Sequence, residues 1–292
     1  MKEIIGWIGI GSMGHRMTRH LVAAGHALVV ADAVSTQRAP PGAKTAKSNA
    51  EVAALADTII FSLPDGDASQ AVAREIAGAS PRRVRTVIDT STIGIKAAEA
   101  VAATLAKVDI TFVDAPVSGG TAGADKATLA IMLACSEPTY ERLKPLMSLM
   151  GRPFFVGPKP GQGQAVKLLN NFLSATALAA TSEAIAFGTS QGIGMKTILD
   201  IVNASTGRNT ATDDKFPRRI INEKYDAGFT AKLQLKDIRL YLENARTAGI
   251  SNDIASAVVG VWTEMDRAMP GADITSMYPY TRDGRRKGNP GT

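Results

Sequence analysis

The sequence predicts an α/β protein in which a doubly wound sheet is followed by an all-α C-terminal domain, the two joined by a long interdomain helix. Apolar strand-like segments alternate with helical segments as far as about residue 157, whereas only helical patterns follow Gln162. A glycine-rich turn also separates the first strand from the first helix. With 292 residues the chain is long enough for two domains. We therefore expect one domain at residues 1–160 and another at 161–292.

The glycine-rich turn lies in a strand, turn, helix, strand unit at the start of the chain. Gly9, Gly11 and Gly14 fit the spacing G-x-G-x-x-G. Gly9 permits the tight turn, Gly11 lets the backbone approach a pyrophosphate, and Gly14 lets the helix pack closely on the strand. This context predicts a Rossmann-type dinucleotide site, and a glycine turn that binds nothing is the alternative.

Asp32 ends the second strand, where a carboxylate can accept hydrogen bonds from both hydroxyl groups of an adenosine ribose. The same carboxylate would repel a 2′-phosphate, so we expect NAD as the cofactor. Arg38 follows within reach of such a phosphate, which leaves NADP possible. The alternative for Asp32 is an ordinary aspartate at the end of a strand.

Further strands and helices alternate after Asp32. Ser48 with Glu51 forms a capping box for a short helix. The repeated pattern predicts parallel strands, whose ligands bind beyond the carboxyl ends. Three residues lie at those ends, and each is also compatible with plain turn chemistry: Leu63, Pro64 and Thr92.

A Ser118-Gly119-Gly120 turn follows a predicted strand and a proline. Such a turn exposes consecutive backbone N–H groups with no side chains in the way, so it can hold a carboxylate. A simple loop is the alternative. Lys236 and Asp237 lie on a helix with several charges, where a surface position is the ordinary interpretation.

A long apolar segment, Gly161–Gly188, carries Lys167 as the one charge between Lys159 and Glu183. The segment predicts a helix buried on nearly all sides, because a surface helix would need a polar face. An ammonium there needs a partner, water in a cleft or a pKa lowered by desolvation, which suits a proton-transfer group. Asn171 shares its helical face at i+4. The alternative is a lysine that snorkels to the surface.

Composition excludes several classes of function. The net charge is +6, but aromatic residues make up only 5% and the basic residues are scattered except at 282–287, so we expect no nucleic-acid partner and a solvated tail there. No apolar stretch is long enough for a membrane span or a signal peptide.

The single cysteine, Cys135, excludes an internal disulfide and fits a cytoplasmic location. We expect no metal site. The three histidines lie near the first helix and are not placed to act as a catalytic base, which leaves Lys167 as the candidate for acid and base catalysis.

Six segments carry a resemblance to a known family. They are WIGIGSMGHRM, SLPDG, DTSTI, FVDAPVSGGTAGA, GQGQAVKLLNN and LKDIRLYLENA, in this order. Together they resemble the β-hydroxyacid dehydrogenase family over about residues 4–249. The resemblance implies a homodimer or homotetramer and a small substrate that bears a carboxylate. In contrast to the family pattern, GRNTATDDKFPRR is unusually basic and polar, so the substrate is expected to differ from those of the best-known members.

The resemblance also implies roles for individual residues. Lys167 is implied to be catalytic, with Asn171 as its hydrogen-bonding partner, and Ser118, Gly119 and Gly120 to bind the substrate carboxylate. The implied cofactor contacts are Gly9, Ile10, Gly11, Ser12, Met13, Gly14, Asp32, Leu63, Pro64, Thr92 and Lys236.

The predicted reaction transfers a hydride between NAD and the hydroxyl carbon of a small 3-hydroxy acid, such as 3-hydroxyisobutyrate, with Lys167 as the general acid and base. The product is a semialdehyde or a keto acid. The alternatives are a reductase of tartronate or succinic semialdehyde and a non-catalytic NAD sensor on the same fold. An imine reductase is disfavoured because that relative usually lacks the lysine.

Overall fold

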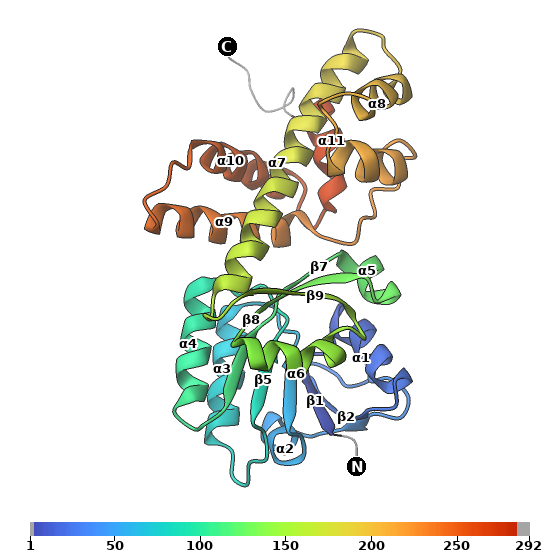
Figure 1. The fold of residues 1–292 in the computed structure, drawn as a ribbon. Coiled ribbons are helices and arrows are strands. Elements are labelled where there is room, and N and C mark those ends of the chain that lie inside the picture. The colour runs from blue at the N-terminus through green and yellow to red at the C-terminus, as the bar shows by residue number, and fades with distance from the viewer. Residues whose placement is uncertain (1–2, 285–292) are drawn as a thin grey trace. The chain divides into compact units, whose positions relative to one another are not determined.

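A computed structural model describes residues 3–284 and divides the chain into two compact units, Met1–Lys167 and Leu168–Thr292. The first unit is α/β and the second is helical, as predicted (Figure 1). The boundary between the units falls inside the long helix α7 (Gln162–Ser190). The functional division at residues 160 and 161 stays a prediction, and most of the basic cluster at 282–287 lies outside the described residues.

One nine-stranded sheet forms the centre of the first unit, with the strand order β3-β2-β1-β4-β5-β6-β8-β7 and β9 paired to β8. The strands are β1 (Ile4–Ile8), β2 (Ala27–Ala31), β3 (Lys44–Thr45), β4 (Thr58–Phe61), β5 (Thr86–Asp89), β6 (Thr111–Asp114), β7 (Val117–Ser118), β8 (Leu129–Ala134) and β9 (Gly151–Gly157).

The parallel pairing predicted for the alternating strands is confirmed as far as β6, and antiparallel pairing occurs at one edge of the sheet. The strands from β3 to β6 are parallel, but β8 is antiparallel to both β6 and β7. A parallel connection needs a crossover that is usually a full helix. The only helix between β6 and β8 is α5 (Gly120–Lys126), which has seven residues, so the chain turns back instead.

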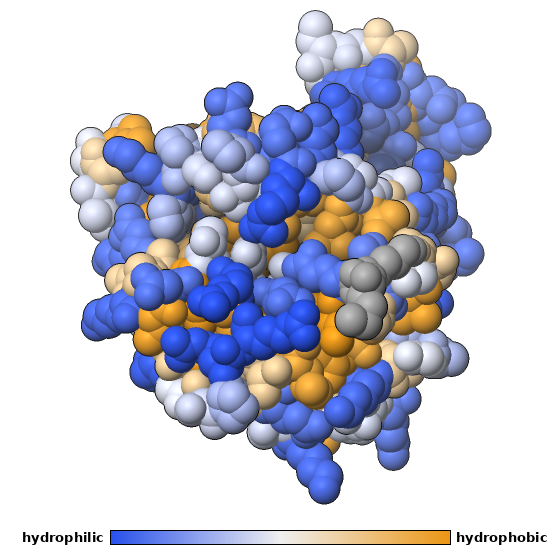
Figure 2. Space-filling view, turned by 60° about the horizontal axis from the view of Figure 1, so that its bottom comes forward, coloured by the Kyte–Doolittle hydropathy of each residue, from blue (hydrophilic) through white to orange (hydrophobic). Residues whose placement is uncertain are grey.

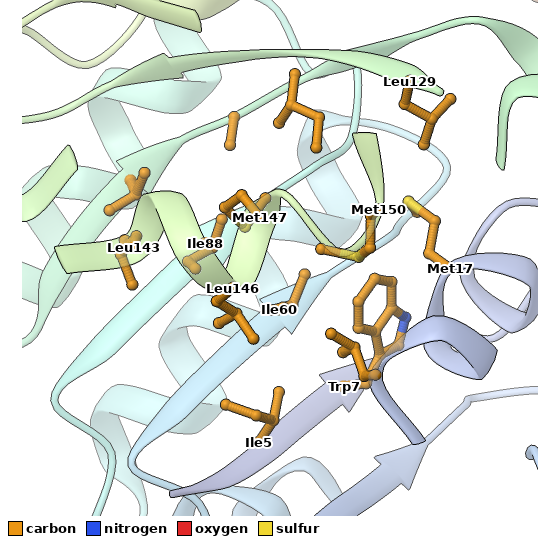
Figure 3. Close-up of a cluster of buried hydrophobic side chains, with 14 of the residues drawn as sticks. Ile5, Trp7, Met17, Ile60, Ile88, Leu129, Leu143, Leu146, Met147 and Met150 are labelled. Carbon is orange, nitrogen blue, oxygen red and sulfur yellow. The ribbon is translucent and has the colours of Figure 1, made fainter. Parts of the chain in front are cut away.

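Helices cover both faces of the sheet because its buried strands alternate their side chains between the faces. Ile5 and Trp7 of β1 join one core with Ile60, Ile88 and the side chains of α6, and Figure 3 shows these residues in one cluster. The other face forms a second core with α2, α3 and α4. The helices of this unit are α1 (Gly14–Ala23), α2 (Asn49–Leu55), α3 (Gly66–Gly78), α4 (Ile95–Ala106), α5 and α6 (Glu137–Met147).

The second unit packs its helices around α7 and a buried tryptophan. Trp262 is fully buried, and its Nε1 donates a hydrogen bond to the carbonyl of Ala175 over 3.3 Å. The elements are α8 (Met195–Asn203), the π-helix η1 (Ala211–Ile220), α9 (Ala231–Thr247), α10 (Asp253–Ala268), the 3-10 turn η2 (Ile274–Ser276), α11 (Met277–Pro279) and the π-helical η3 (Tyr280–Gly284). None of the helices within residues 3–284 combines the length and apolarity needed to cross a membrane.

Candidate active site

The turn between β1 and α1 packs two of its glycines tightly and leaves the third open. Gly9 has φ +93°, and a Cβ there would lie 2.2 Å from the carbonyl oxygen of Ser62. A Cβ on Gly14 would lie 2.0 Å from the carbonyl oxygen of Gly9, which also accepts a 2.9 Å hydrogen bond from Trp7 Nε1. A Cβ on Gly11 would meet nothing within 4 Å. Gly11 thus leaves open space beside the N-terminus of α1, which suits a pyrophosphate.

The first turn of α1 contains no acidic residue that would repel such a phosphate. Asp32, at the end of β2, holds the surrounding loops together. Its Oδ2 accepts a 2.8 Å hydrogen bond from the backbone N–H of Ile10, and its Oδ1 accepts from those of Val34 (2.8 Å) and Ser35 (3.1 Å). A carboxylate has about four acceptor positions, so about one is left for a ribose hydroxyl. Asp32 therefore shapes the loop as well as being a candidate for cofactor recognition.

The carboxyl ends of five parallel strands lie in register along one edge of the sheet. Ile8 pairs with Ala31 and with Phe61, Phe61 pairs with Asp89, and Asp89 pairs with Asp114. A dinucleotide binds at this edge in doubly wound sheets. The segments that leave the edge carry the remaining predicted cofactor contacts of this unit: Leu63, Pro64 and Thr92.

The predicted carboxylate-binding turn joins a short strand to a helix. Ser118 ends β7, and Gly119 (φ +135°) and Gly120 (φ +62°) lead into α5. Both glycines adopt φ values that L-residues rarely take. Asp125 of α5 forms a 3.1 Å ion pair with Arg16 Nε, so α5 is fixed to the helix that follows the glycine-rich turn.

The start of α7 is attached to the same sheet edge by a buried carboxylate. Asp114 Oδ2 accepts 3.0 Å hydrogen bonds from the backbone N–H groups of Gly161 and Gln164, and its Oδ1 accepts from Gln164 Nε2 over 2.7 Å. A Cβ on Gly163 would lie 2.6 Å from the carbonyl oxygen of Met132. The glycines of this segment thus let α7 begin in close contact with the sheet.

Gln164 links this helix turn to the segment after β5. Its Oε1 accepts hydrogen bonds from the backbone N–H groups of Ile93 (2.9 Å) and Gly94 (3.1 Å), and its Nε2 also donates to the carbonyl of Ser91. Lys167 follows three residues later, on the same helical face, and only 8% of it is exposed. A buried lysine therefore lies one turn beyond a helix start that is fixed to the edge of the sheet.

Burial raises the pKa of the Asp114 carboxyl group from 3.8 to about 6, and it also raises the pKa of the neighbouring Asp89. Between about pH 4 and pH 6 the folded protein thus binds more protons at Asp114 than the unfolded chain does, so the free energy of unfolding falls as pH rises through this window. The contribution of Asp114 to the free energy of unfolding is expected to fall by about 3 kcal/mol across this window.

We therefore expect Asp114→Asn to reduce the slope with which the free energy of unfolding falls between pH 4 and pH 6, measured by urea unfolding. The exposed Asp67→Asn is the matched control and should keep the wild-type slope. Because Asp89 still titrates in the variant, a reduced slope is expected instead of a flat line. Identical slopes for wild type and Asp114→Asn would contradict the assignment.

The second unit contains a buried polar group around Asn171. Asn171 Nδ2 donates a 2.6 Å hydrogen bond to Asp237 Oδ2, and the other carboxylate oxygen lies 3.2 Å from Lys236 Nζ. Gln234 Nε2 donates to the carbonyl of Asn171 over 3.2 Å. Asp237 is only 2% exposed, so it is not the surface residue that its charged helix suggested. The two predicted site residues of this unit, Asn171 and Lys236, thus share one carboxylate.

Three features together define a nucleotide-dependent dehydrogenase. They are the glycine-rich turn that is open at Gly11, the strand ends that lie in register along one edge of the sheet, and the buried lysine on α7. Within residues 3–284, no group of three or more His, Cys, Asp or Glu side chains could hold a metal ion. Three buried residues of this arrangement were not predicted as site residues from the sequence: Asp114, Gln164 and Asp237.

Comparison with known proteins defines the family. Residues 4–157 match the NAD binding domain of 6-phosphogluconate dehydrogenase, and residues 161–281 match the family described as NAD-binding of NADP-dependent 3-hydroxyisobutyrate dehydrogenase. The chain belongs to the β-hydroxyacid dehydrogenase family. It is therefore an oxidoreductase that acts on a hydroxyacid with NAD(P) as its cofactor.

Individual relatives share nearly the whole chain. The 2-(hydroxymethyl)glutarate dehydrogenase of Eubacterium barkeri is 32% identical over 89% of this chain and 95% of that protein. The NAD-dependent L-serine dehydrogenase of Pseudomonas aeruginosa is 32% identical over 90% and 91%. The structure of Mycobacterium tuberculosis 3-hydroxyisobutyrate dehydrogenase with L-serine superimposes with a TM-score of 0.89 at 28% identity, over 97% of this chain and all of that one.

Proposed function

We propose that the chain transfers a hydride between NAD and the hydroxyl carbon of a small 3-hydroxy acid, with Lys167 as the general acid and base. The bound nicotinamide supplies the hydride chemistry. During oxidation, Lys167 Nζ takes the proton of the reacting hydroxyl group, and it returns that proton during reduction. The product is a semialdehyde when the hydroxyl group is primary and a keto acid when it is secondary.

The observation that carries this proposal is the burial of Lys167 one turn beyond Gln164. A lysine with 8% exposure has little access to bulk water, so a role as a snorkelling surface residue is disfavoured. The bonds from Gln164 to the segment after β5 keep this part of α7 beside the edge at which dinucleotides bind. This placement suits a group that serves the reacting carbon.

Asn171 is proposed to position the reacting oxygen and the lysine. The side-chain amide of Asn171 donates a hydrogen bond to Asp237, which fixes the orientation of the Asn171 side chain. Lys236, in contact with the same carboxylate, is proposed to contact the cofactor. A shared carboxylate would hold these two residues in a constant relation to each other.

The Ser118-Gly119-Gly120 turn is proposed to hold the substrate carboxylate. The positive φ values of both glycines support a concave arrangement of backbone N–H groups there. The relatives are named for 2-(hydroxymethyl)glutarate, 3-hydroxyisobutyrate and L-serine. In each of these acids one carbon atom bears both a hydroxymethyl group and a carboxylate. We infer that the substrate of this chain shares that unit.

A steady-state screen of 3-hydroxy acids and semialdehydes, run with NAD and NADP in parallel, tests the proposal. We expect turnover of acids with a 3-hydroxyl group and a higher kcat/KM with NAD than with NADP, because the Asp32 carboxylate would repel a 2′-phosphate. Turnover of 2-hydroxy acids alone would contradict the substrate class. A preference for NADP would contradict the role of Asp32.

We also propose a homodimer or homotetramer that works in the cytoplasm. Helix α7 exposes three large apolar side chains, and apolar groups reach the surface on the face seen in Figure 2. These residues of α7 are Leu169, Leu173 and Phe187. Exposed apolar area of this kind suits contact with another subunit. Light scattering of the purified protein measures the subunit number, and cell fractionation tests the location.

A further inference from the structure

Lys215 is a half-buried lysine of the second unit that reaches the catalytic face of α7. Its Nζ donates a 3.2 Å hydrogen bond to Ser174 Oγ. Ser174 follows Asn171 by three residues and Lys167 by seven, so these three side chains share one face of the helix. Lys215 is thereby held on the face of α7 that carries the proposed acid and base.

Among the described side chains, none forms an ion pair with Lys215. The nearby Asp213 and Asp214 form ion pairs with Arg208 (3.2 Å) and Arg218 (3.3 Å). Burial lowers the pKa of Lys215, although the two aspartates oppose that shift. A desolvated cation without a paired anion is costly for a folded protein unless a ligand supplies the anion.

The backbone that carries Lys215 is also unusual. Residues Ala211–Ile220 form a π-helix, and Pro217 within it has no N–H to donate to an α-helical turn. Short π-helical segments are frequent at functional sites. Residues 211–219 of this π-helix belong to the basic and polar stretch, 207–219, in which the sequence departs from the family pattern.

We propose that Lys215 determines specificity by binding a second carboxylate of the substrate, so that the substrate is a 3-hydroxy dicarboxylic acid. This inference rests on the proposed function and names its substrate class. An ammonium has three N–H donors, and Ser174 takes only one of those on Lys215. Ser174 lies about 10 Å along the helix from Lys167. We infer that a short carbon chain joins the reacting hydroxyl group to the second carboxylate.

The test compares two substrates with the same reacting group, 3-hydroxyisobutyrate with one carboxylate and 2-(hydroxymethyl)glutarate with two. Wild type should prefer the dicarboxylate. Lys215→Met should lower kcat/KM for the dicarboxylate by about 10- to 100-fold, mainly through KM, and leave the monocarboxylate nearly unchanged. Lys215→Arg should retain most of the preference. The exposed Lys232→Met is the matched control and should behave as wild type.

A binding measurement tests the same point without turnover. Glutarate and butyrate, titrated by calorimetry into the protein with NAD, should show a preference for glutarate that Lys215→Met abolishes. Equal affinity for the two acids in wild type, or an equal loss for both in Lys215→Met, would overturn the inference. Failure of the proposed function would appear separately, as absence of NAD-linked turnover with either hydroxy acid while the glutarate preference persists.

Discussion

Lys167→Ala is expected to lower kcat by about 10²- to 10⁴-fold, because general acid and base catalysis contributes a factor of this size. Affinity for NAD should stay close to that of wild type, since the glycine-rich turn and Asp32 lie far from Lys167 in the sequence and make their own hydrogen bonds. Single-turnover kinetics with a saturating 3-hydroxy acid measures the loss of the chemical step. Titration of NAD, followed by quenching of tryptophan fluorescence, measures binding.

Lys159→Ala is the matched control for this experiment. Lys159 is exposed just before α7, and its backbone N–H, which the substitution keeps, bonds to Gln162 Oε1 over 2.8 Å. It should retain wild-type kcat. Near-wild-type turnover by a folded Lys167→Ala protein would exclude Lys167 as the acid and base. In that case Lys236 would be the next lysine to test.

The parts of the site that could be predicted from sequence are those with a fixed spacing or a lone charge. Gly9, Gly11 and Gly14 are recognisable because a turn between strand and helix needs glycine at defined positions. Lys167 is recognisable because a charge is rare in an apolar helix. In both cases a local rule applies, so a few neighbouring residues suffice.

The polar groups that fix α7 depend on contacts between distant segments, so the sequence did not reveal them. Asp114 is 50 residues from Gln164, and nothing in the strand that contains it shows that its carboxylate will accept three N–H groups. Asp237 likewise resembles half of a surface ion pair with Lys236 until the structure places Asn171 beside it. The glycine-rich start of this segment, GQGQ, is the one local pattern close to Gln164, and it does not show which groups the glutamine contacts.

The sheet shows the same limit. Strands β1 to β6 follow a repeating strand and helix pattern, which predicts parallel pairing. The direction of β8 depends on how short α5 is, and the glycine-rich segment that forms α5 has weak helix propensity. Its position beside α1 is fixed by ion pairs between residues more than 100 apart, such as Arg16 and Asp125. Local patterns cannot anticipate such contacts.

Gly14→Ala and Gly11→Ala form a pair that separates the packing role of the glycine-rich turn from its binding role. A Cβ on Gly14 would lie 2.0 Å from the carbonyl oxygen of Gly9 and 2.9 Å from Trp7 Nε1, so the backbone must shift and the bond between Trp7 and Gly9 must weaken. We expect Gly14→Ala to lower the free energy of unfolding by about 3 kcal/mol without any ligand present.

Gly11→Ala should leave that stability within about 1 kcal/mol of wild type, because a Cβ there meets no atom within 4 Å. Its methyl group would instead occupy the space that a pyrophosphate needs, so NAD affinity should fall by at least about tenfold. Urea unfolding and calorimetric titration of NAD measure the two effects on the same samples. Wild-type NAD affinity in Gly11→Ala would show that the pyrophosphate binds elsewhere along the sheet edge, whereas an equal loss of stability in both variants would show that Gly11, too, is required for packing.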